Sequence, residues 1–129
     1  MSMDIPTAVL ISDKASAPAA STALAIAATS VTFGDNFTMY GTSMTRPALA
    51  VCRPHDGNAA SAGNGNMAAI ACDSRAKVDA IHAKAIELGA SDEGAPGVRG
   101  DEGPQAFYGA YFRDLDGNKL CAFRIGPAD

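Results

Sequence analysis

The sequence predicts an α+β fold made of two successive βαβββ modules. The first observation behind this prediction is a strand–helix unit that occurs twice, with strand candidates at residues 7–11 and 67–72. Asp13 and Asp73 stand at the same offset from the two strands and are good caps for the helices that follow. The second observation is that β-forming residues follow each helix, separated by turn residues. We interpret the two units as an internal repeat.

The first module begins with the predicted strand at residues 7–11. The cap at Asp13 leads into an Ala-rich helix predicted over residues 14–29, with Pro18 in its first turn, where proline is tolerated. Three strand-like segments rich in β-formers follow the helix: 31–33, 37–41 and 48–52.

The second module contains the clearest helix of the chain. Ser74, next to Asp73, is a good N-cap, and Gly89 stands where a helix often ends in a left-handed residue. Between them one face of the helix carries a set of mostly apolar side chains at helical spacing: Val78, Ile81, His82, Ala85 and Ile86.

After this helix, residues 90–104 are rich in Gly, Pro and acidic side chains and are predicted to be a loop. Residues 106–112 and 119–125 are predicted to be two strands of a hairpin, joined by the turn residues 114–118.

The length of 129 residues suits one compact domain, which we expect to cover residues 1–129. Its half-modules are predicted at about 5–53 and 66–126, joined by a linker at 54–65 that holds Pro, Gly and Asn.

Composition excludes several functions. The net charge is −4, and the ten Lys and Arg residues are scattered, which argues against a nucleic-acid partner. No apolar run reaches the roughly 18–20 residues of a membrane span, so we expect no membrane partner. Three widely spaced cysteines, Cys52, Cys72 and Cys121, form neither a disulfide framework nor a zinc pattern. We therefore expect reduced thiols and a cytoplasmic protein.

Residues 107–120, FYGAYFRDLDGNKL, resemble the C-terminal signature of the vicinal oxygen chelate superfamily, whose usual form is F-x-D-P-D-G-N-x-x-E. That superfamily includes glyoxalase I, bleomycin-resistance proteins, fosfomycin-resistance enzymes and extradiol dioxygenases. Residues 53–57 and 78–82 resemble its glyoxalase-like branch. The resemblance covers residues 48–126 well and the first half weakly.

The resemblance implies a curved mixed sheet in each half, one helix on the outside of each sheet, a cavity between the sheets, and a homodimer. It also places the metal ligands of the metalloenzyme members on Thr7, Met67 and Cys121, with the fourth position near Ala50. None of these residues is a carboxylate or an imidazole, so the sequence predicts no catalytic metal and no cofactor.

Strand alternation, applied to that fold, predicts which side chains line the cavity and bind a ligand. They are Thr7, Val9, Ala50, Met67, Ala69, Phe107, Tyr111, Cys121 and Phe123. Leu120 and Ala122 are expected to face the helix layer instead.

Four residues have two interpretations each. Tyr111 is either the polar anchor of a ligand or an aromatic filler, and Cys121 is either a nucleophile or an inert buried thiol. His82 is either a boundary histidine or a base. Arg99 either pairs with an anionic ligand or is a solvated loop arginine. We assign no catalytic residue.

The resulting functional hypothesis is a metal-independent protein that sequesters a small hydrophobic or aromatic compound, as bleomycin-resistance proteins do. The alternative is an enzyme, an isomerase, lyase or resistance enzyme acting on a small carbonyl-containing substrate in the same cavity. The absence of His, Asp and Glu from the predicted lining favours binding, because general acid–base catalysis needs such a group. A dimeric scaffold without a ligand is the third possibility.

Overall fold

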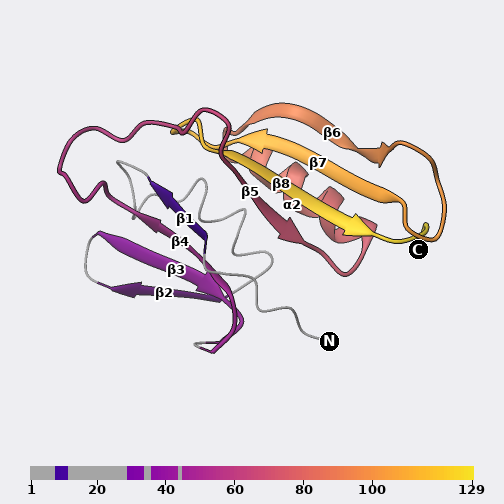
Figure 1. Ribbon diagram of the computed structural model, residues 1–129, viewed down its shortest axis with the longest axis horizontal. Coiled ribbons are helices and arrows are strands. Elements are labelled where there is room, and N and C mark those ends of the chain that lie inside the picture. The colour runs from indigo at the N-terminus through magenta and orange to yellow at the C-terminus, as the bar shows by residue number, and fades with distance from the viewer. Residues whose placement is uncertain (1–7, 12–28, 34–35, 44) are drawn as a thin grey trace.

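A computed structural model describes residues 8–11, 29–33, 36–43 and 45–129 of the chain (Figure 1). These residues form two four-stranded mixed sheets with the same strand order. Sheet A has the order β1-β4-β3-β2, and sheet B has the order β5-β8-β7-β6. In each sheet the first strand pairs in parallel with the last, and the other neighbours are antiparallel. The predicted α+β fold is confirmed.

Sheet A is formed by the first half of the chain. Its strands are β1 (Ala8–Ile11), β2 (Thr29–Phe33), β3 (Phe37–Gly41) and β4 (Ala48–Cys52). The predicted helix at 14–29 falls outside the described residues except at its end. There the prediction is wrong by one position, because Thr29 already pairs with Gly41 as the first residue of β2.

Sheet B is formed by the second half. Its strands are β5 (Met67–Ala71), β6 (Ser91–Arg99), β7 (Phe107–Arg113) and β8 (Lys119–Ile125), and the helix α2 (Arg75–Glu87) follows β5. The predicted caps of this helix are confirmed. The Ser74 hydroxyl accepts a hydrogen bond from the Lys77 amide at 3.1 Å. Gly89 has a φ of +102°, which favours glycine over any other residue.

Helix α2 covers one face of sheet B, and in Figure 1 it lies behind β7 and β8. The helix buries Val78, Ile81 and Ala85 as predicted, whereas Ile86 remains exposed. These side chains pack against a set from β7 and β8 that is almost completely buried: Ala110, Phe112, Leu120 and Ala122. Apolar burial between helix and sheet is therefore the main stabilising contribution in this half.

The prediction of a loop at 90–104 is wrong, because residues 91–99 form the strand β6. This strand lies at the edge of sheet B, where Pro96 is tolerated since one side of an edge strand needs no partner. Its pairing with β7 shifts register between Asp92 and Gly94 and again between Gly94 and Gly97. The glycines that suggested a loop thus belong to an irregular edge strand.

Among the described residues, no helix is both long enough and apolar enough to cross a membrane.

Candidate functional site

The two faces of sheet B have different neighbours. On the face covered by α2, Phe112 is buried and the Tyr108 hydroxyl donates a hydrogen bond to the Asp79 carboxylate of the helix at 2.7 Å. Strand alternation puts Tyr111 on the opposite face, directly across from Cys121 of β8. We call this second face the open face of sheet B. It is the face that carries the residues of β7 and β8 predicted to bind a ligand.

Tyr111 is at the centre of the open face. The Arg99 guanidinium of β6 and the Lys119 ammonium of β8 each lie 5.6 Å from the centre of its ring. Both distances are within the range of a cation–π interaction. Since β7 runs between β8 and β6 in the sheet, the two cations approach the phenol from its two neighbouring strands.

Cys121 lies beneath this group and is only 1% exposed. Burial raises the pKa of its thiol, and this effect outweighs the neighbouring Tyr111 hydroxyl and the Arg99 and Lys119 charges, which act in the opposite direction. Burial also raises the pKa of Tyr111, and the adjacent Cys121 adds to that shift. Both shifts favour the protonated forms at neutral pH, which supports the interpretation of Cys121 as a buried, unreactive thiol and leaves the Tyr111 hydroxyl as a donor.

This state of the cysteines predicts an order of alkylation. At pH 7.5, iodoacetamide is expected to modify the partly exposed Cys52 first and the buried Cys72 and Cys121 much more slowly. Peptide mass spectrometry over a time course measures the three rates, with urea-unfolded protein as the control in which the rates converge. Preferential labelling of Cys121 in the folded protein would show that it is an activated nucleophile.

An aromatic pair occupies one end of the open face. The rings of Phe107 and Phe123 stack nearly parallel, with their centres 5.5 Å apart. Gly109 makes room for this pair, since a Cβ at that position would lie 2.5 Å from the Phe107 ring. The stack adds apolar aromatic side chains to the face that carries the phenol of Tyr111.

The other predicted residues are distributed unevenly. Met67 and Ala69 of β5 pair with Lys119 and Cys121 and are exposed, so they extend the open face to the edge of sheet B. Ala50 belongs to sheet A and is completely buried. Val9 pairs with Ala50 in register, and Thr7 lies outside the described residues. Four predicted residues of the second half therefore share one face, Phe107, Tyr111, Cys121 and Phe123, with Met67 and Ala69 at its edge. Ligand binding by all nine residues stays a prediction.

The side chains at the metal positions do not fit the divalent ion of the superfamily. Ala50 offers no donor, while Met67 and Cys121 offer a thioether and a protonated thiol, which are soft ligands. In the part of the chain that the structure describes, no three His, Cys, Asp or Glu side chains converge on a common point. We therefore derive no chemical step through a metal.

His82 does not lie on the open face. It is buried on α2 against the edge of the Phe112 ring, and its Nε2 lies 3.0 Å from the Asp92 carboxylate of β6. The backbone amide of Gly94 and then His82 lower the pKa of Asp92. The pair links the helix to the edge strand, which supports the interpretation of His82 as a structural residue.

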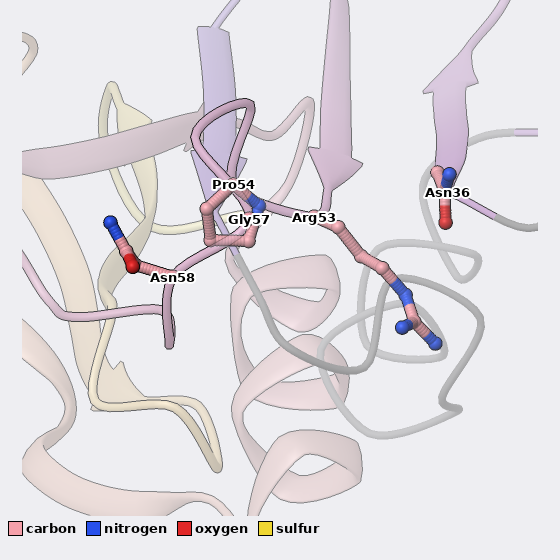
Figure 2. Close-up of a pocket in the computed structure, with 5 residues that line it drawn as sticks. All are labelled: Asn36, Arg53, Pro54, Gly57 and Asn58. Carbon is pink, nitrogen blue, oxygen red and sulfur yellow. The ribbon is translucent and has the colours of Figure 1, made fainter.

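A pocket of about 330 Å³ lies elsewhere, where β4 ends and the linker begins (Figure 2). Figure 2 shows that the Arg53 side chain extends toward the side on which Asn36 lies. The turn beside it is held by the Asp56 carboxylate, which accepts hydrogen bonds from the Asn58 backbone and side chain and has a lowered pKa as a result. The pocket is lined by Asn36, Arg53, Pro54, Gly57 and Asn58, none of which the sequence predicted as a site residue.

Arg99 is the residue of the open face that sequence reasoning undervalued. Its placement in a loop is wrong, because Arg99 is the last residue of β6 and pairs with Phe107, although its side chain is exposed. Its register put the guanidinium on the same face as Tyr111. The signal that could have found it is the alternation of β6, which the Gly and Pro residues of that strand obscure.

No protein-family model matches the sequence, and no curated protein matches it either. Solved structures do. The chain is 28% identical to a glyoxalase/bleomycin resistance protein from Albidiferax ferrireducens, with a TM-score of 0.75 over 93% of this chain and 98% of that chain. A glyoxalase/bleomycin resistance protein/dioxygenase family enzyme from Burkholderia phytofirmans has 14% identity and a TM-score of 0.66, over 95% of this chain and 99% of that chain.

A lactoylglutathione lyase from Agrobacterium tumefaciens has 18% identity and a TM-score of 0.61, over 93% of this chain and 92% of that chain. Each alignment spans nearly the whole of both chains, so both sheets are included. The chain therefore has the fold of the glyoxalase/bleomycin resistance/dioxygenase family, consistent with the vicinal oxygen chelate superfamily that its sequence resembles.

Proposed function

We propose that this chain is a metal-independent protein that binds and sequesters a small aromatic or hydrophobic compound on the open face of sheet B. The observation that supports the proposal most directly is the group around Tyr111. A phenol with a raised pKa shares a sheet face with a stacked aromatic pair, and α2 covers the opposite face. Such a surface offers apolar contact area and one directional hydrogen-bonding group, which is the usual composition of a small-molecule site.

The chemistry of the same residues favours binding over catalysis. The Cys121 thiol is protonated, and the described positions of the open face carry no imidazole. The carboxylate of Glu93, at the margin of the face, is held in an ion pair with Arg113. A positioned acid or base for proton transfer is therefore missing from this part of the structure.

The experiment is a thermal-shift screen of small organic compounds against protein treated with EDTA, followed by calorimetry of the hits. We expect stoichiometric binding that added Zn²⁺, Mn²⁺ or Fe²⁺ does not strengthen. Binding that depends on one of these ions would overturn the metal-independent proposal. If the protein converts a carbonyl-containing hit into a product, it is an enzyme and the sequestration proposal is wrong.

Tyr111→Phe is expected to make the binding free energy of a hit compound less favourable by about 0.5–1.5 kcal/mol, because the variant loses one hydrogen bond and keeps the ring. Calorimetry of the wild type and the variant measures the difference. Tyr108→Phe is the matched control: it removes a hydroxyl that bonds to Asp79 on the helix side of the same strand. Equal losses in the two variants, or no loss in Tyr111→Phe, would mean that the phenol does not anchor the ligand.

We also propose that the protein is a cytoplasmic homodimer. Each chain is proposed to form one domain over residues 1–129, with a linker at 54–65 between its two halves. The dimer and the compartment rest on the resemblance and on three cysteines that form no disulfide. Sedimentation velocity tests the dimer directly, since a species of 13.1 kDa at high micromolar concentration would be a monomer.

A further inference from the structure

We propose that the compound bound on the open face is a small aromatic carboxylate, and that Arg99 and Lys119 recognise its negative charge on either side of Tyr111. The inference rests on the proposed function and adds the chemical class of the ligand. It changes the expectation for the site from a largely apolar surface to one that selects an anion.

The two cations are close enough to act on one ligand. Each lies 5.6 Å from the centre of the Tyr111 ring, so their charged groups are at most about 11 Å apart. A carboxylate beside the phenol would be attracted by both positive charges, and it would reduce the repulsion between them. The hydroxyl of Tyr111, which interacts with the Cys121 thiol in this structure, supplies a third donor when it turns to the same carboxylate.

Neither cation has an acidic partner among the residues that the structure describes. Arg99 donates one hydrogen bond, from Nη2 to the Ala95 carbonyl at 2.7 Å, which leaves most of its five N–H groups available. Arg113, on the same face, is different: it forms an ion pair with Glu93 and donates to the Gly117 carbonyl at 2.9 Å. The face thus contains one arginine whose charge is compensated and two cations whose charges are not.

The local sequence of β6 leaves room for the Arg99 guanidinium. A Cβ at Gly94 would lie 3.2 Å from Arg99 Nη2, and a Cβ at Gly97 would lie 3.1 Å from Nη1. Both distances are tighter than ordinary contacts. The two glycines therefore leave the space in which the guanidinium lies along the strand and against Tyr111.

The stack of Phe107 and Phe123 supplies the second half of the recognition. It is an apolar aromatic pair on the same face as Tyr111, at diagonal positions of β7 and β8. An aromatic ring next to this stack can place an attached carboxylate toward the phenol and the two cations. A planar acid satisfies both features, whereas a simple inorganic anion satisfies only one.

Calorimetry with matched acids and amides tests the inference. The probes are benzoate and benzamide, and 2-naphthoate and 2-naphthamide. Each pair has the same ring system and differs in charge. We expect at least one acid to bind about tenfold more tightly than its amide, with an affinity that falls as salt rises, because the difference is a charge-assisted contact.

Variants locate the charge recognition. Arg99→Gln and Lys119→Gln are each expected to lower the affinity of the acid about tenfold and to leave the affinity of the amide unchanged. Lys84→Gln, which removes a lysine paired with Glu87 on α2, is the matched control and should change neither. Gly97→Ala keeps the charge of Arg99 but displaces its guanidinium, so it should lower the affinity for the acid and leave the affinity for the amide unchanged. Circular dichroism and thermal melting establish that each variant is folded.

The outcomes separate this inference from the proposed function. If acid and amide bind equally, or if the two glutamine variants behave like the lysine control, the charge recognition is wrong while the binding function stands. If the four probes and the compound screen all give no binding, both are wrong.

Discussion

Phe112→Ala is expected to lower the free energy of unfolding by about 3–5 kcal/mol, the largest effect of any single substitution that we predict. The ring is 1% exposed and lies between sheet B and α2, where it packs in the same cluster as Ile81 and Leu120. Its edge also faces His82, at 6.4 Å between ring centres. Alanine would remove the apolar contacts and leave a cavity that the rigid sheet cannot close.

Urea denaturation followed by circular dichroism measures this loss. Leu115→Ala is the control, since Leu115 is 56% exposed in the turn between β7 and β8 and its truncation should change the stability by less than about 0.5 kcal/mol. A loss below about 1 kcal/mol in Phe112→Ala would mean that the interface between helix and sheet is not the main core of this half.

Asp114→Ala is expected to lower the free energy of unfolding by roughly 2–3 kcal/mol. The side chain is buried, and its Oδ1 accepts hydrogen bonds from the Asp116 amide at 2.9 Å and the Asn118 amide at 2.8 Å. Its Oδ2 accepts a third, from Asn118 Nδ2 at 2.9 Å. Alanine would leave these donors without their partner in a turn that has little access to water.

The same denaturation experiment measures the loss, with Asp101→Ala as the control because that acid is exposed in the loop after β6. We also expect Asp114→Ala to weaken ligand binding, since the turn sets the register that places Tyr111 opposite Cys121. A variant as stable as the control would show that the turn is held by its backbone alone, including Gly117, whose φ of +85° favours glycine.

Most of the second half could be predicted from its sequence because its signals are local. Ser74 and Gly89 mark the ends of α2, and turn residues separate β7 from β8. Strand β6 could not be predicted in the same way. Gly94, Pro96 and Gly97 have low β-propensity, and pairing along β7 outweighs that propensity. Tertiary contacts therefore decide the structure where local preference is weak.

The site could be predicted only in part, for the same reason. Alternation along β7 and β8 relates Tyr111 to Cys121 because these strands are regular and their turn is recognisable. Arg99 comes from a segment whose Gly and Pro residues predict a loop, and no face can be assigned to a residue before its segment is recognised as a strand. The charge on the open face thus becomes visible only in three dimensions.

The pairing of each half's first strand with its last has a consequence for a nascent chain. Strand β5 has one neighbour in sheet B, β8, and Lys119 follows its partner Met67 by 52 positions. The hairpin of β7 and β8 can form from local contacts, but β5 acquires its partner only after β8 has been synthesised. A chain released before residue 119 would therefore present unpaired edges of β5 and β7 to chaperones and to other chains.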